Sequence, residues 1–339
     1  MEQRQEAQAA AARLDALQEF AARFAAGSGV FTRTLDAVAA QVLVAFRQAG
    51  VDALLLKGRA LATLLYRAGE QRDYSDVDLL VPPHALEAAE ATLRGLGYEN
   101  ASSAQGIDDI GGVVHSDTWI RGTPGSWDQP MIDLHRWLPG ARATPGKAWE
   151  ALAARRTWIE IEGLQAAVLD RGGQAMHLAT HAAQHGPAFP KHVDELALGL
   201  ERWPADVWDA AALLAHQIDA TEAFAAGLRL VPEGTEVAER LALRSTAELD
   251  WTIRHRHARP RGTFHLQALA DARGARERVR ILRRSLLPSQ AWIMHEHPWA
   301  RAGGLRVIAA YGAHLARAPG WAASAWLFRR RARRAGRAR

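Results

Sequence analysis

Two apolar runs that carry charged residues constrain the fold of this chain more than any other feature of its sequence. The first, Leu55–Gly58, ends in a Lys-Gly turn, and the second, Asp76–Val81, begins eighteen residues after that glycine. Side chains two positions apart on a β-strand point to the same face, so we expect Asp76 and Asp78 to converge while the apolar residues pack behind them. Two buried carboxylates repel each other and are costly to desolvate, and a divalent cation relieves both effects. The second run therefore predicts a metal site on a strand.

A third carboxylate extends this pattern. Asp133 lies in the short run Met131–His135, on the same predicted strand face as His135. Three carboxylates from neighbouring strands can hold two divalent ions about 3.5–4 Å apart, an arrangement that supports in-line phosphoryl transfer. Mg²⁺, or Mn²⁺ in its place, favours such oxygen ligands. An isolated Asp-x-Asp pair is a weak signal, but here it follows a Lys-Gly turn and precedes Asp133. The combination predicts a metal site that handles phosphate.

The periodicity along the chain predicts a mixed α/β core followed by helices. Strands are predicted at 52–57, 75–81, 113–121, 131–135 and 158–161, with another extended piece that begins at Gly97-Tyr98. Helices are predicted at 34–48, 59–68 and 83–94. Strand–helix–strand–helix followed by a strand hairpin indicates an α/β (α+β) fold with a mixed sheet flanked by helices. Beyond residue 161 the pattern is almost wholly helical. We therefore expect an N-terminal helical segment at 1–33, an α/β core at 34–165 and a mainly helical C-terminal domain with a basic tail at 166–339.

Composition and charge narrow the class of protein. The 339-residue chain has no cysteine, which excludes disulfides and cysteine-ligated metal clusters. It shows no secretory signal and no uninterrupted apolar run of about 18 residues, so we expect a cytoplasmic protein without a membrane span. The net charge of +5 is concentrated in the C-terminal third, including the tail at 329–339. No aromatic residues interleave with the arginines of the tail, so a solvated helix end is favoured over a nucleic-acid partner.

The motifs of the predicted core resemble a known family. The residues that carry the resemblance are Leu55–Gly58, Tyr66, Arg72, Asp76–Val81, Leu96–Tyr98 and Ile132–His135. They look like the uncharacterised nucleotidyltransferase family of the polymerase-β-like superfamily, whose members often accompany bacterial gene clusters for peptide modification, including lasso peptides. The similarity continues into the helical region. It is carried there by Met176–His185, Asp194 and Leu286–Ser289.

The resemblance implies a nucleotidyltransferase-like sheet and a role for each of the three carboxylates. Asp76 and Asp78 would be metal ligands. Asp133 would bind the catalytic metal and take the proton of the acceptor. Mg²⁺ or Mn²⁺ would then be the cofactor, with a nucleotide as the donor substrate.

The resemblance also implies a phosphate-binding turn at Gly58, whose backbone N–H groups would face the nucleotide phosphates at a helix start. The superfamily places Gly-Ser at this turn, whereas this chain has Gly58-Arg59. Lys57, Arg59 or Arg72 could supply the missing contact electrostatically. The sequence leaves open which of the three reaches the phosphates.

The histidines have more than one interpretation. His115, His135 and His181 are candidates for lining an acceptor pocket, because each is predicted near the carboxylates or on the family's histidine-bearing helix. His181 and its neighbours four residues away, His177 and His185, form one stripe on a helix. His181 and His185 could chelate zinc, but the H-E-x-x-H motif is absent and helix packing is the favoured interpretation.

The sequence thus favours a metal-dependent nucleotidyltransferase that moves a nucleoside monophosphate from an NTP to a hydroxyl-type acceptor and releases pyrophosphate. The acceptor would be a peptide or a small metabolite. Two alternatives stay open. Asp-x-Asp carboxylates also serve glycosyltransferases, which use a sugar nucleotide as donor, and a nucleotidyltransferase fold could act as a non-catalytic, antitoxin-like binding protein. The presence of all three carboxylates argues against the latter.

Overall fold

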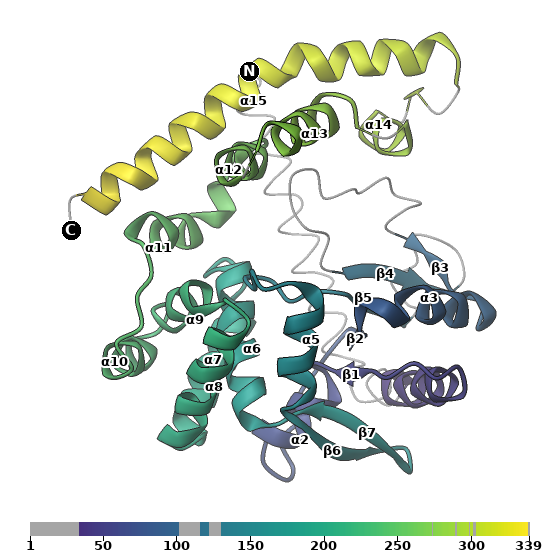
Figure 1. Ribbon diagram of the computed structural model, residues 1–339, viewed down its shortest axis with the longest axis vertical. Helices are drawn as coiled ribbons and strands as arrows, with labels where there is room; N and C mark the ends of the chain where they lie inside the picture. The colour runs from purple at the N-terminus through teal and green to yellow at the C-terminus, as the bar shows by residue number, and fades with distance from the viewer. Residues whose placement is uncertain are drawn as a thin grey trace.

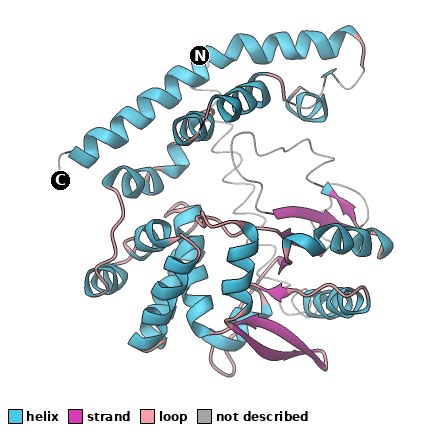
Figure 2. Ribbon diagram, in the orientation of Figure 1, coloured by secondary structure: helices cyan, strands magenta, loops and turns pink. Residues whose placement is uncertain are grey.

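A seven-stranded mixed sheet organises the first half of the protein, as a computed structural model shows (Figures 1 and 2). The structure describes residues 34–101, 116–121, 130–272, 274–288, 290–297, 299–300 and 303–337. The strands among them are β1 (Leu54–Leu55), β2 (Asp76–Leu80), β3 (Glu99–Asn100), β4 (Ser116–Ile120), β5 (Met131–His135), β6 (Arg156–Ile161) and β7 (Leu164–Leu169). Their order across the sheet is β3-β4-β5-β2-β1-β7-β6. β2 and β5, which carry the predicted carboxylates, are adjacent parallel strands at the centre.

Helices cover the sheet and make up almost all of the second half of the chain. The helix at 34–48 precedes β1 and, with those between the strands, belongs to the sheet region. The helices in this region are α2 (Arg59–Leu65), η1 (Pro83–Ala85), α3 (Leu86–Gly95) and α5 (Pro145–Ala153). The next group is α6 (Arg171–His185), α7 (Pro190–Arg202), α8 (Ala205–Gln217), α9 (Thr221–Leu228) and α10 (Pro232–Arg240). The last group is α11 (Ala247–Arg254), η2 (Arg256–Ala258), α12 (Thr263–Asp271), α13 (Ala275–Leu286), α14 (Gln290–Glu296) and α15 (Leu305–Arg337).

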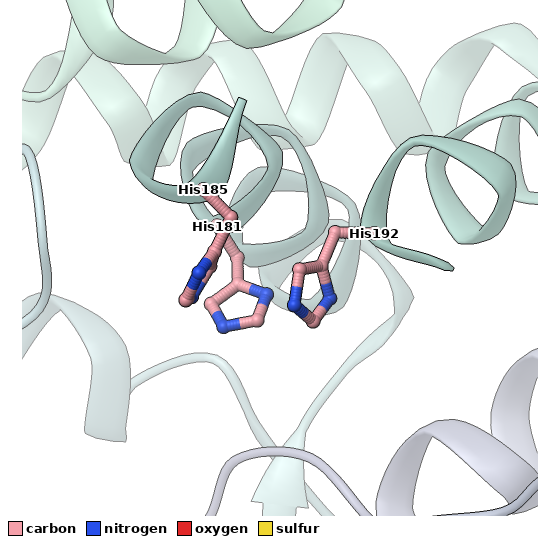
Figure 3. Close-up of side chains that lie close together, drawn as sticks. All are labelled: His181, His185 and His192. Carbon is pink, nitrogen blue, oxygen red and sulfur yellow. The ribbon is translucent and has the colours of Figure 1, made fainter. Parts of the chain in front are cut away.

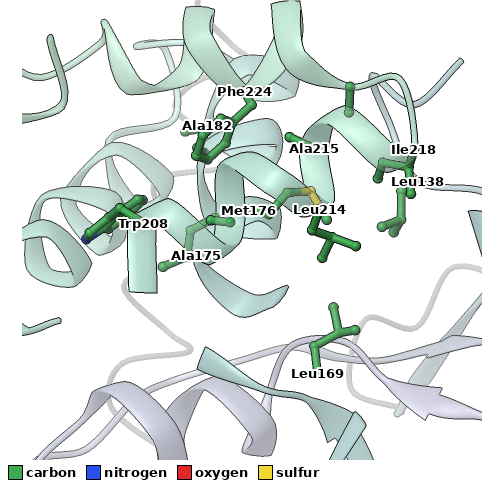
Figure 4. Close-up of a cluster of buried hydrophobic side chains, with 14 of the residues drawn as sticks. Leu138, Leu169, Ala175, Met176, Ala182, Trp208, Leu214, Ala215, Ile218 and Phe224 are labelled. Atoms are coloured by element: carbon green, nitrogen blue, oxygen red, sulfur yellow. The ribbon is translucent and has the colours of Figure 1, made fainter. Parts of the chain in front are cut away.

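The alternation of side chains along the strands creates two hydrophobic cores. Val77 and Leu79 of β2 belong to the core that includes the 34–48 helix, whereas Leu80 belongs to the core that includes α6, α8 and α9. Figure 4 shows the second core, to which Leu169 of β7 and Met176 of α6 both belong. Because strand residues alternate in direction, Asp76 and Asp78 face the same side as Leu80, toward α6.

The predicted fold class is confirmed, with one strand missed. The predicted strand at 131–135 has the predicted bounds, and β2 lies within the predicted 75–81. The predicted helix at 34–48 is helical throughout and ends at residue 48, and the N-terminal segment predicted at 1–33 lies outside the described residues. The expectation of almost wholly helical structure beyond residue 161 is wrong for β7, which pairs with β6 and with β1. The expected domain boundary after residue 165 lies inside this strand.

The C-terminal helices α11 to α14 pack along the long helix α15, which Figure 1 shows in yellow. The basic residues 329–337 belong to α15, and Arg329 donates a hydrogen bond to the Leu266 carbonyl at 2.8 Å. Among the described helices, none is long and apolar enough to cross a membrane.

Candidate active site

The predicted carboxylates come together at the centre of the sheet. Parallel pairing places Asp78 opposite Asp133. The neighbouring antiparallel strand β4 places Thr118 opposite Asp133, and the Thr118 hydroxyl donates a 2.7 Å hydrogen bond to Asp133 Oδ1. Asp76 lies two residues before Asp78 on the same strand face. The register of three strands therefore produces the juxtaposition expected from the sequence.

These carboxylates form one wall of a cavity of about 270 Å³. The sheet contributes Asp76, Asp78, Asp133 and His135. A basic wall of cationic and imidazole groups completes the lining. It comes from the Gly58 turn and the loop before β2, which adjoin the carboxylates, and from α6 and α7. Its members include Lys57, Arg72, His177, His181, His185, Lys191 and His192. The cavity thus brings carboxylates together with cationic and imidazole groups.

Asp78 is the most strongly held of the carboxylates. It is 1% exposed, and its Oδ1 accepts from Lys57 Nζ and contacts His135 Nε2, each at 2.9 Å. Its second oxygen, Oδ2, is buried and has no hydrogen-bond partner among the described residues. A buried carboxylate oxygen without a partner is costly, and a bound cation would supply the missing partner.

The carboxylates titrate differently because their neighbours differ. Burial, reinforced by the charge of Asp78, raises the pKa of Asp76 to about 7. Burial acts in the same direction on Asp78, but Lys57 and the His135 hydrogen bond outweigh it and hold the pKa of Asp78 below its usual value. Burial and the Asp78 charge raise the pKa of Asp133. Asp78 is therefore ionised when Asp76 can still carry a proton.

This donor set fits a divalent cation. Ligand atoms of Asp78, Asp133 and His135 lie within 4.8 Å of one another. Asp76 lines the same cavity but is outside that set of three. Carboxylate oxygens are the ligands that Mg²⁺ and Mn²⁺ prefer. The buried Asp78 Oδ2, which has no hydrogen-bond partner among the described residues, is available as one of these ligands. His135, predicted as an acceptor-pocket residue, lies among the carboxylates.

Gly58 occupies a backbone conformation that requires glycine. Its φ of +59° lies in the left-handed region, and a Cβ built there would stand 3.3 Å from the Tyr74 ring. Lys57, just before the turn, points into the cavity, whereas Arg59, just after it, is absent from the cavity lining and pairs with Asp36 at 3.4 Å. The turn therefore sends its two cationic side chains to different places.

Arg72 lines the cavity but is engaged by a residue that sequence reasoning missed. Its guanidinium forms a bidentate pair with Glu195 of α7, at 2.8 and 3.1 Å, and both side chains are buried. Arg72 also donates to the Gly58 carbonyl at 3.4 Å. Asp194, the acid indicated by the resemblance, is exposed. The pair therefore ties α7 to the Gly58 turn.

The histidine stripe of α6 lies on the basic wall. His181 Nε2 is 3.3 Å from Lys57 Nζ, which places it beside the carboxylate network. His177 and His185 flank it on the same helix, and α7 adds His192, which sequence reasoning missed because it lies beyond the helix boundary. His115 lies outside the described residues.

Comparison with known proteins places the chain in a family. No curated protein matches it. Among solved structures, the solution structure of the antibiotic-resistance factor ANT(2'')-Ia is 18% identical, with 56% of this chain and 94% of that chain covered and a TM-score of 0.37. The crystal structure of ANT(2'')-Ia in complex with adenylyl-2''-tobramycin is 17% identical, with 54% and 98% covered and a TM-score of 0.37. An antigenic nucleotidyltransferase-like protein from Paracoccidioides brasiliensis is 12% identical, with 58% and 93% covered and a TM-score of 0.30.

The family comparison covers more than half of the chain. A model of the family described as "Uncharacterised nucleotidyltransferase" matches residues 4–234, which include β1 to β7 and α6 to α9. The match ends before Leu286–Ser289, so this part of the predicted resemblance lies outside it. On this match, the protein belongs to the uncharacterised nucleotidyltransferase family.

Proposed function

We propose that this protein is a metal-dependent nucleotidyltransferase that moves a nucleoside monophosphate from an NTP to a hydroxyl group of a peptide or small metabolite. The observation that carries the proposal is the single cavity with an acidic wall on the sheet and a basic wall on α6, α7 and the Gly58 turn. A triphosphate needs cationic partners, and the metal ions that accompany it need carboxylates. Both sets face the same space here.

Asp76, Asp78 and Asp133 would hold Mg²⁺ or Mn²⁺. Bound there, the metal would supply neutralisation of the developing phosphate charge and activation of the acceptor hydroxyl. Lys57 would keep Asp78 ionised and ready to bind, since its ammonium lies 2.9 Å from Oδ1.

The basic wall would position the triphosphate. Lys57 and Lys191 can each place an ammonium group in the cavity, and the Gly58 turn can present backbone N–H groups. Arg72 would act mainly by positioning that turn through its bond to the Gly58 carbonyl. Arg59, paired with Asp36, is the weakest of the predicted phosphate contacts.

Asp133 is the proposed base. Burial raises its pKa, which favours proton uptake, and Thr118 fixes one of its oxygens. The acceptor oxygen would form a bond to the α-phosphorus while the bond from that phosphorus to the pyrophosphate oxygen breaks. The acceptor proton would pass to Asp133. His135 of the sheet and His181 of α6, which both line the cavity, would border the acceptor.

The setting we propose is the cytoplasm, where NTPs are available. The core at 34–165 would hold the donor, and the helical region from residue 166 would contribute to the acceptor side. A peptide acceptor would suit a role in peptide modification. Histidine-lined space next to the carboxylates gives that acceptor access to the base.

The test is transfer of label from each NTP to candidate acceptors, read by intact mass. A nucleotide-sized increment with pyrophosphate release is expected, and Asp78→Asn should lower the rate by about 100-fold or more, equivalent to about 2.7 kcal/mol. Asp209 on α8, whose side chain is 49% exposed, offers the matched control, Asp209→Asn.

Two outcomes would overturn the proposal. A hexose-sized increment from a sugar nucleotide, with none from an NTP, would assign glycosyl transfer instead. If the double variant Asp76→Asn, Asp78→Asn binds Mg²⁺–nucleotide as tightly as the parent protein, these carboxylates do not bind the metal. Neither nucleotidyl nor glycosyl transfer could then depend on them for metal binding.

A further inference from the structure

Three histidines converge beside the carboxylate site without belonging to it. Figure 3 shows the rings of His181 and His185, from α6, and His192, from α7, gathered around one space. The ring centroids form a nearly equilateral triangle, with separations of 4.2 Å between His181 and His192 and 4.5 Å for each of the other two pairs. One ligand nitrogen from each ring lies within 4.8 Å of the other two.

These imidazoles are in the form that binds metal. Lys57 Nζ can only donate, so the His181 Nε2 atom 3.3 Å away must accept, and an accepting imidazole is neutral. Burial lowers the pKa of His192 to about 4 and that of His185 to about 3, and it holds the pKa of His181 well below its usual value. His192 Nδ1 is buried and has no hydrogen-bond partner among the described residues. Helix packing alone leaves that nitrogen unexplained.

We propose that His181, His185 and His192 form a binding site for a divalent transition-metal ion of the Zn²⁺ class, separate from the carboxylate site. Three neutral nitrogen ligands suit Zn²⁺, whereas the oxygen ligands on the sheet suit Mg²⁺. Three protein ligands also leave a coordination position, as in zinc sites that exchange a water or an anion. All three histidines line the cavity, so that position faces it.

The geometry needs only a small adjustment to accept the ion. Zn–N bonds of about 2.0–2.1 Å at tetrahedral angles place two ligand nitrogens about 3.3 Å apart. The rings lie on two helices joined by a short turn, and side-chain rotation can bring their nitrogens together. The ammonium of Lys57 opposes a second cation, but Asp78, 2.9 Å away, offsets that charge and gives Lys57 an alternative partner when His181 turns to the metal.

The site would join two helices at their shared corner. His181 and His185 lie in the last two turns of α6, and His192 lies in the first turn of α7. A bound ion would therefore fix the start of α7. From there Lys191 reaches the cavity, and Glu195 pairs with Arg72. This proposal stands independently of the donor and acceptor assigned above.

The test uses the full-length protein stripped with chelator and then titrated with Co²⁺ in excess Mg²⁺, which occupies the carboxylates. One Co²⁺ per chain with the intense visible absorption of a tetrahedral or five-coordinate nitrogen site is expected. Zn²⁺ should displace the Co²⁺, and metal analysis after dialysis should find about one zinc per chain.

Variants separate the two sites. His192→Gln and His185→Gln should each weaken Zn²⁺ binding at least tenfold, whereas His216→Gln, at an exposed histidine of α8, and Asp133→Asn should change it less than twofold. Circular dichroism identifies any variant that fails to fold. If one of the two histidine variants fails to fold, the Zn²⁺ affinity of the other tests the proposal. Weak octahedral Co²⁺ absorption in the parent protein would overturn the proposal, as would equal losses in Asp133→Asn and His192→Gln.

Discussion

Binding of Mg²⁺ to the sheet carboxylates is expected to displace a proton, and Asp76 is the group that supplies it. Burial beside Asp78 raises the pKa of Asp76 to about 7, whereas Lys57 and His135 keep Asp78 ionised. A carboxylate must lose its proton before it binds a metal ion. Acidification below pH 7 therefore weakens Mg²⁺ binding through Asp76.

The magnitude follows from that pKa. With a value of about 7, about nine tenths of the Asp76 carboxyl groups are protonated at pH 6 and about one tenth at pH 8. The dissociation constant for Mg²⁺ should then be about tenfold larger at pH 6 than at pH 8. Each ion bound should release about 0.9 proton at pH 6 and about 0.1 proton at pH 8.

Isothermal titration calorimetry in two buffers with different ionisation enthalpies measures this proton release directly. The Asp76→Asn variant is the control, because it has no proton to lose at this position and should bind Mg²⁺ more weakly and with less dependence on pH than the parent protein. Release of less than about 0.2 proton at pH 6 by the parent protein would refute the assignment. Equal release by Asp76→Asn would place the titrating group elsewhere.

Two further predictions concern the supports of the site, and both are measured by chemical denaturation. Gly58→Ala should destabilise the protein by about 1–3 kcal/mol, because alanine is strained at a φ of +59° and its Cβ would press on Tyr74. The control is Gly69→Ala, at a φ of +88° with open space around it. It should show only the part of the loss that comes from backbone strain. A smaller loss for Gly58→Ala would contradict the packing argument. Glu195→Gln should cost about 3–5 kcal/mol, because it leaves a buried guanidinium without its charge partner, whereas Asp209→Asn, in an exposed ion pair, should cost less than about 1 kcal/mol. Equal costs would show that burial adds nothing to the Glu195 pair.

The juxtaposition of the carboxylates was predictable because it depends on local period and strand pairing. Asp76 and Asp78 share a face through the two-residue repeat of a strand, and Asp133 lies opposite Asp78 in the observed register. Their joint location in the cavity follows from these two facts. Their roles as metal ligands and base stay predictions.

The missed strand β7 shows where periodicity fails. Residues 166–169 are all buried, so the alternation that marks a half-exposed strand is absent, and the alanines favour a helical interpretation. The turn before it held a usable signal. Glu162 and Gly163 both have positive φ, as the two-residue hairpin turns that match strand twist require, and an acidic residue followed by glycine is compatible with that type.

Contacts between distant segments were beyond sequence reasoning. The partner of Arg72 is Glu195 rather than its exposed neighbour Asp194, a choice made by the rotation of α7 against the sheet region. His192 joins the α6 stripe only because α7 turns back across it. Arg59 turns toward Asp36 on the 34–48 helix, a contact that depends on how that helix packs.

The position of the short strand β1 bears on where the chain can accept insertions or deletions. The Leu56 N–H donates a 3.0 Å hydrogen bond to the Asp78 carbonyl, so the residue before Lys57 is fastened directly to the strand that carries the carboxylates. The chain between Leu56 and Asp78, which includes α2 and the exposed residues 67–71, is therefore a loop whose two ends are held together by this hydrogen bond. Insertions or deletions at 67–71 can therefore change the length of this loop while the distance between Lys57 and Asp78 stays the same. Changes in the length of this segment can therefore leave the residues that line the cavity in place, because none of residues 67–71 belongs to its lining.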